Sequence, residues 1–113
     1  MSRDDLRPIV KQFIKSIENQ WRNDVSAIQY RIVDTRRANI FIIEMEIFGK
    51  FNIKMEYENS TLGISVKQDN MFVGLSKLTN EKVYIGFDSC EPENIQHNFE
   101  VLDRTLCKMM KNT

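Results

Sequence analysis

An alternation of apolar and polar residues from residue 40 to residue 66 constrains this chain most strongly. Two breaks, Gly49-Lys50 and Asn59-Ser60, divide it into three segments. Successive side chains of a β-strand point to opposite faces, so a period of two places every apolar residue of these segments on one face of a sheet. These residues are Phe41, Ile43, Met45 and Ile47, then Phe51, Ile53, Met55 and Tyr57, then Leu62, Ile64 and Val66.

The pairing of these three strands follows from the requirement that apolar residues face apolar residues across each hairpin. At the first break this requirement predicts a loop with an odd number of residues. At the second break, Asn59-Ser60 suits a two-residue loop. The predicted pairs are Ile47 with Phe51, Met45 with Ile53, Ile43 with Met55, the oppositely charged Glu44 with Lys54, Tyr57 with Leu62, and Met55 with Ile64.

Amphipathic helices are predicted on both sides of this region, because apolar residues there recur at helical spacing. The first helix is expected from about Leu6 to Arg22, with Asp5 as its N-cap and Pro8 in its first turn. The second follows capping residues and an early proline after Asp88, and ends in cations that suit a helix C-terminus. The apolar stripes are Leu6, Ile9, Val10, Phe13, Ile14, Ile17 and Trp21, and then Ile95, Phe99, Leu102, Leu106, Met109 and Met110.

Three further strands are predicted outside the central region. They are Val25 to Val33 with Ile28, Tyr30 and Ile32 on the core side, Met71 to Ser76 with Val73 and Leu75 inward, and Val83 to Phe87. The element order is a helix, an antiparallel meander of five to six strands, and a second helix, which indicates an α+β two-layer sandwich. A length of 113 residues suits a single domain, residues 1–113.

The composition argues against two broad classes of function. The 16 Lys and Arg residues balance 16 Asp and Glu residues, whereas salt-driven binding of nucleic acid needs a surplus of basic residues. The longest apolar run, Ile40 to Ile43, is far shorter than a membrane span, and the charged N-terminus is unlike a signal peptide. With two cysteines and no disulfide framework, we expect a reduced, cytoplasmic protein.

The sequence predicts no catalytic, cofactor-binding or metal-binding residues. His97, the single histidine, is expected on the exposed side of the second helix. Cys90 precedes that helix, whose dipole would favour a thiolate, and Cys107 lies about 25 Å further along it. We interpret both as incidental thiols. Arg36 and Arg37, with Arg31 nearby, are expected to form an ordinary charged turn.

The outward face of the central hairpin is the best candidate for a binding surface. It combines four carboxylates and one clear Lys partner with two isoleucines that the sheet is not expected to bury. Catalysis by these carboxylates is disfavoured, because an open sheet face neither desolvates them nor separates their pKa values. The alternative is a solvated face on which stray isoleucines serve strand propensity. The predicted partner-binding residues are Ile40, Ile42, Glu44, Glu46, Lys54, Glu56 and Glu58.

The layout of the whole chain, with its acid-rich face, resembles small bacterial immunity proteins that block toxins of contact-dependent inhibition. The resemblance implies tight one-to-one binding of a toxin domain, often over its active site, by a protein that is monomeric alone. It implies that Glu44, Glu46, Glu56 and Glu58 mimic phosphate charge toward a basic nuclease cleft. The balanced charge of this chain departs from the more acidic immunity proteins that oppose nucleases.

Two other classes remain open. Secretion chaperones are also small α+β proteins, but they dimerise and typically carry a further helix between strands. A small-ligand carrier or enzyme would use the concave space between sheet and helices. We expect that space to be full, because Phe13, Trp21, Met45, Met55 and Phe99 would occupy it.

Overall fold

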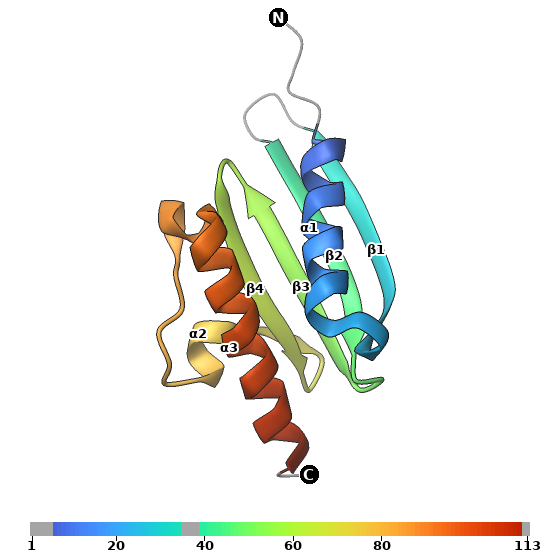
Figure 1. Cartoon of the computed structure of the whole chain (residues 1–113), viewed down its shortest axis with the longest axis vertical. Coiled ribbons are helices and arrows are strands. Elements are labelled where there is room, and N and C mark those ends of the chain that lie inside the picture. The colour runs from blue at the N-terminus through green and yellow to red at the C-terminus, as the bar shows by residue number, and fades with distance from the viewer. Residues whose placement is uncertain (1–5, 35–38, 112–113) are drawn as a thin grey trace, which may run out of the picture.

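Five antiparallel strands form a single sheet in the computed structural model of the chain, which describes residues 6–34 and 39–111. The strands follow one another across the sheet in chain order, so the predicted meander is confirmed. Both long helices lie on the same face of the sheet (Figure 1), which makes the fold the predicted two-layer sandwich. The elements are α1 (Arg7–Trp21), η1 (Arg22–Asp24), β1 (Val25–Asp34), β2 (Asn39–Ile47), β3 (Phe51–Glu58), β4 (Thr61–Gln68), β5 (Met71–Gly74), α2 (Leu75–Leu78), η2 (Gly86–Cys90) and α3 (Pro92–Lys111).

The register of the central strands is the predicted one. Ile47 lies opposite Phe51, Glu44 opposite Lys54, and Tyr57 opposite Leu62. The β2–β3 loop has an odd length, residues 48–50, and begins with left-handed backbone at Phe48 and Gly49. The β3–β4 turn uses two left-handed residues, Asn59 (φ 46°) and Ser60 (φ 68°), a conformation that matches the right-handed twist of a hairpin.

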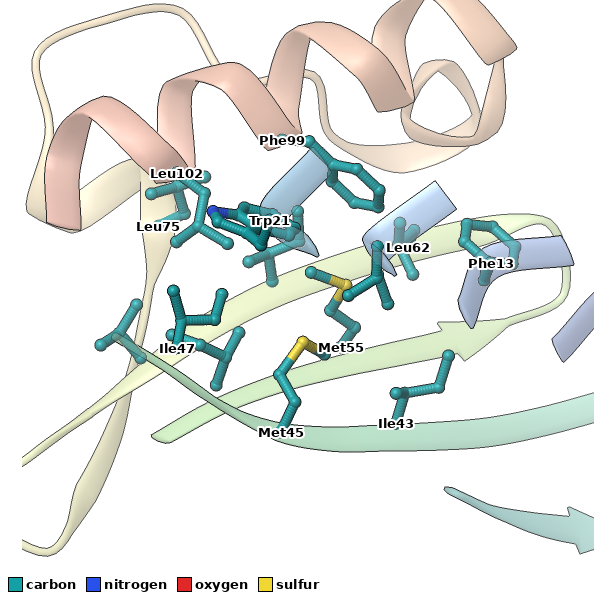
Figure 2. Close-up of a cluster of buried hydrophobic side chains, with 14 of the residues drawn as sticks. Phe13, Trp21, Ile43, Met45, Ile47, Met55, Leu62, Leu75, Phe99 and Leu102 are labelled. Carbon is teal, nitrogen blue, oxygen red and sulfur yellow. The ribbon is translucent and has the colours of Figure 1, made fainter. Parts of the chain in front are cut away.

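The core lies between the inward face of the sheet and the apolar stripes of the helices (Figure 2). The five side chains expected to fill this space, Phe13, Trp21, Met45, Met55 and Phe99, are all buried. The Trp21 and Phe99 rings meet with centroids 5.4 Å apart. The Trp21 Nε1–H donates a hydrogen bond of 3.0 Å to Asp103 Oδ1 and ties the end of α1 to α3. The predicted alternation therefore separates buried from exposed side chains along the central strands.

The first helix differs from the prediction at its ends, whereas the closing helix begins inside the predicted entry of residues 88–93. The first helix begins at Arg7 and ends at Trp21, one residue inside the prediction at each end. Leu6 occupies the N-cap position without a capping side chain, and Pro8 lies in the first turn; Asp5 is outside the described residues. The closing helix begins at Pro92, and Met110, predicted in its apolar stripe, is exposed.

The outer strands also differ from the prediction in detail. β1 extends to Asp34, and the predicted turn residues Arg36 and Arg37 lie outside the described part of the chain. Tyr30 lies on the core face, opposite Ile43, but 45 % of its surface is exposed because β1 is an edge strand. β5 ends at Gly74, so the inward Leu75 is buried as the first residue of α2 instead of as a strand residue.

The predicted strand from Val83 to Phe87 is wrong. Residues 83–85 have no regular secondary structure, η2 follows, and Ile85 and Phe87 are 71 % and 79 % exposed. The segment lies against α3 because the buried Asn98 side chain binds the backbone of Tyr84 twice. Its Oδ1 accepts from Tyr84 N–H at 2.9 Å and its Nδ2 donates to Tyr84 C=O at 3.0 Å. These bonds replace those of a strand ladder.

Replacing Asn98 with Ala is expected to lower the free energy of unfolding by about 2 kcal/mol, because it leaves two part-buried backbone groups of Tyr84 unsatisfied. Urea denaturation followed by circular dichroism measures the change. Asn94→Ala is the matched control on the same helix: its Nδ2 donates one exposed bond to Asp88 C=O, so its cost should be well under that of Asn98→Ala. Equal costs would contradict the assigned role of Asn98.

Candidate protein-binding face of the sheet

The sheet face opposite the helices, here called the open face, carries all seven residues predicted to bind a partner. The inward residues of β2 and β3 are buried, so the residues between them point away from the helices. The register gives the cross-strand neighbours on this face: Ile40 with Glu58, Ile42 with Glu56, Glu44 with Lys54, and Glu46 with Asn52. Glu44, Glu56 and Glu58 are exposed, whereas Ile40, Glu46 and Lys54 are half-buried.

Ile42 departs from the expectation that the two isoleucines are left uncovered, since only 9 % of its surface is exposed. In the register it lies between Arg31 of β1 and Glu56 of β3. Long charged side chains cover neighbouring apolar surface with their aliphatic stems while keeping the charge in water. Ile42 therefore has little exposed surface on a face that none of the described helices covers, and a partner would have to move these side chains to reach it.

Cations from neighbouring strands flank the acidic side chains, a feature that the prediction from the central hairpin missed. Arg31 pairs with Ile42 on one side, and Lys67 of β4 lies on the open face on the other. Lys54 lies among Glu44, Glu46, Glu56 and Glu58, the set here called the acidic residues, and Arg31 and Lys67 border this set. The alternation along β1 and β4 could have identified both cations. The open face thus carries mixed charge rather than a purely acidic patch.

A shallow hollow of about 300 Å³ lies on this face and adds an aromatic contact to it. Phe72 of β5 is 38 % exposed there, and the Lys54 Nζ lies 4.6 Å from the centre of its ring. A cation over an aromatic face is attracted by the ring quadrupole. The sequence prediction did not single out Phe72. The residues that line the hollow are Ala27, Gln29, Glu44, Met45, Glu46, Asn52, Ile53, Lys67 and Phe72.

This arrangement suits recognition of a charged macromolecular surface. Charged groups that stay in water steer an incoming partner and add specificity, while the apolar surface beneath them supplies area to bury. Within residues 6–34 and 39–111, no group of three His, Cys, Asp or Glu side chains could hold a metal ion.

An apolar groove of about 370 Å³ lies in the concave space between the helices, outside the core. α1 contributes Phe13, α3 contributes Ile95, and Tyr57 of β3 also lines the groove. Gln96 of α3 donates a 2.9 Å hydrogen bond to Gln20 of α1 and links the helices beside it. The full lining is Ile9, Gln12, Phe13, Ser16, Tyr57, Cys90, Pro92, Ile95 and Gln96. The groove could take a small apolar molecule.

The thiols of Cys90 and Cys107 are free, and neither is activated. Burial raises the pKa of the Cys90 thiol, and a hydrogen bond from Ser89 offsets this only in part. Burial also raises the pKa of the Cys107 thiol. Loss of solvation outweighs any stabilisation of a Cys90 thiolate by the helix dipole, which agrees with the interpretation of both residues as incidental thiols.

We expect iodoacetamide to alkylate Cys90 and Cys107 more slowly in the folded protein at pH 8 than in urea, because the thiolate is the reactive form and a raised pKa depletes it. Peptide mass spectrometry follows each site. Above pH 9.0, the ordinary thiol pKa, the unfolded chain ionises first, so this contribution to stability is lost as the pH rises through the folded pKa. Faster alkylation of the folded protein would contradict the assignment.

His97 is half-buried, not exposed as predicted, and it holds the 82–84 segment against α3. Its Nε2 lies 2.8 Å from the Lys82 carbonyl oxygen, and its ring meets Tyr84 edge-on at 5.2 Å between centroids. Arg104 supports the same segment through a 2.7 Å ion pair with Glu81, which lowers the pKa of that carboxyl group. The histidine thus has a structural role beside Asn98.

No family model, curated protein sequence or solved structure matches this chain. In the part of the chain that the structure describes, the helices lack the combination of length and apolar character needed to cross a bilayer.

Proposed function

We propose that this chain is a non-enzymatic immunity protein that binds a toxin domain and neutralises it. The observation that carries the proposal is the open face, which lies opposite both helices and displays exposed carboxylates beside sheltered apolar surface and Phe72. Carboxylates of this kind steer a partner of opposite charge, and aromatic residues such as Phe72 are enriched at protein interfaces. The partner in this proposal is a basic nuclease domain, and the acidic residues occupy its phosphate-binding cleft.

The charge distribution supports one detail of this proposal. The acidic residues run along the central hairpin, and Arg31 and Lys67 border them. Cations placed around an acidic strip would repel surfaces that are uniformly basic and favour those with a bordered basic cleft. Such a pattern supports specificity for one toxin domain.

Two alternatives retain some support. A secretion chaperone would also be small and non-enzymatic, although strands β1 to β5 follow one another without an intervening helix among the described residues. A carrier of a small apolar molecule is favoured by the groove lined by Phe13, Tyr57 and Ile95. Fatty acids added to the protein would then raise its melting temperature.

Capture from the native host tests the proposal. The tagged chain is purified, any protein recovered in equal amount is identified, and that protein is expressed alone in a test strain. Under the proposal it inhibits growth, and co-expression of this chain restores growth. A captured protein that is harmless alone, or the absence of a stoichiometric partner, would contradict the immunity function. A captured secreted effector would favour the chaperone alternative.

A further inference from the structure

We infer that the edge strand β1 pairs with β1 of a second copy of this chain, antiparallel and across a two-fold axis at Tyr30. The inference is independent of the proposed function, because pairing at this edge leaves the acidic residues of β2 and β3 uncovered. It revises the expectation that the protein is monomeric alone.

The two edges of the sheet differ in length and in how they are covered. β5 has only four residues and runs directly into α2. β5 pairs only with residues 65–68 of β4. The earlier part of that edge is covered by η2, where Ser89 Oγ accepts a 2.7 Å hydrogen bond from Leu62 N–H. β1, by contrast, has ten residues and forms one margin of the molecule (Figure 1). Among the described residues no element pairs with the outer edge of β1, and a long unpaired edge strand is a template for pairing with another chain.

The hydrogen-bond pattern shows which backbone groups β1 offers. Successive residues of an antiparallel strand direct their N–H and C=O groups alternately to the two neighbouring strands. Asn59 N–H donates to Asn39 C=O, so the odd-numbered residues of β2 form hydrogen bonds with β3 and the even-numbered ones with β1. Ile42 and Glu44 pair with Arg31 and Gln29, which therefore bond inward. Tyr30, between them, and Ile32 direct their N–H and C=O groups to the free edge. These same residues carry their side chains on the helix face of the sheet.

Side chains along β1 are complementary to those of a second β1 in one register. With Tyr30 opposite its own copy, Ile28 meets Ile32 on the helix face and Gln29 meets Arg31 on the open face. A shift of one residue would set apolar faces against polar ones. A shift of two toward Asp34 would place Arg31 opposite Arg31, which is unfavourable. The half-exposed Tyr30 rings would gain an aromatic partner and lose contact with water.

The extent of the pairing is limited by a bulge. The β1–β2 register shifts between Ser26 and Gln29, and Ala27 there has left-handed backbone (φ 54°). A bulge twists the strand and ends regular pairing. The two copies therefore meet over Ile28 to Ile32. Because this interface is short, we expect a weak dimer whose population rises between micromolar and millimolar protein concentrations.

Sedimentation velocity over that range tests the inference. The measured mass should rise from 13.4 kDa toward twice that value as the concentration increases. Tyr30→Glu places two like charges opposite each other and should keep the mass at one chain. Met71→Glu makes the same kind of change at the exposed, opposite edge and should leave dimerisation intact. A single-chain mass for the unmodified protein at about 1 mM, a concentration at which even a weak dimer would be populated, or a dimer that survives Tyr30→Glu, would overturn the inference.

A cysteine placed on the axis tests the register. In a chain with Cys90→Ala and Cys107→Ala, Tyr30→Cys should form a disulfide between two copies on mild oxidation, because directly opposed strand residues lie within bridging distance. Arg31→Cys in the same background is the control, since it would face Gln29 of the second copy and should remain reduced. Equal cross-linking of both variants, or none at position 30, would overturn the pairing at Tyr30.

Discussion

Replacing Ile43 with Ala is expected to lower the free energy of unfolding by about 2–5 kcal/mol, the largest loss predicted for a single side chain here. Ile43 is fully buried, lies on β2 opposite Met55, and faces the helices. Truncation removes buried apolar surface and leaves a cavity that a close-packed core fills only in part. Guanidinium denaturation measures the change through the transition midpoint at constant slope.

Ile42→Ala is the matched control, since it makes the same truncation one residue earlier on the same strand. Ile42 is almost as little exposed, but it lies on the open face, where its cross-strand neighbours are the flexible charged residues Arg31 and Glu56. These can collapse onto a smaller residue, so we expect a cost of about 1 kcal/mol. Equal costs at the two positions would mean that the open face is packed like a core, which would contradict its assignment as a binding surface.

Reversing the charge of the acidic residues by Lys substitution at Glu44, Glu46, Glu56 and Glu58 is expected to slow association with the toxin domain on the order of 100-fold. The carboxylates would steer a basic cleft toward the open face, and lysines would repel it. The melting temperature should change little, because three of the four side chains are exposed. Surface plasmon resonance with the captured toxin domain measures the association rate, and the difference between variants should shrink as salt is added.

Pairs of substitutions separate position from net charge. Glu56→Lys with Glu58→Lys alters exposed residues of the open face, whereas Glu18→Lys with Glu100→Lys makes the same charge change on the helices. Only the first pair should slow association strongly. An equal effect of the two pairs would indicate a response to net charge alone. Unchanged binding of the fourfold variant would discard the open face as the site and leave the immunity function to be tested by growth rescue.

Much of the fold could be predicted because the strand pairing is local. The alternation assigns each residue of β2, β3 and β4 to a face, and the two turns then leave one register that sets apolar against apolar. The helix stripes were equally readable, apart from single-residue errors at their ends. The weakest prediction, the strand from Val83 to Phe87, rested on a short alternation that a loop can also show.

The candidate site could be predicted only in outline. The alternation identified which side chains leave the core, and all of them lie on the open face. It did not show that Arg31 and Lys67 border the acidic residues, or that Phe72 contacts Lys54. Those neighbours come from strands that meet only when the sheet forms.

The sequence by itself determined the layers, the meander and the register, because each of these depends on residues a few positions apart and on a period that fixes which way a side chain points. The tertiary structure alone decided the path of residues 83–87, the shelter of Ile42 and the free edge at β1. Asn98 binds Tyr84 from a helix 14 residues further along the chain, and Ile42 is covered from two other strands. Contacts of this kind depend on how the formed helices and strands pack together, and the local pattern of apolar and polar residues does not specify that packing.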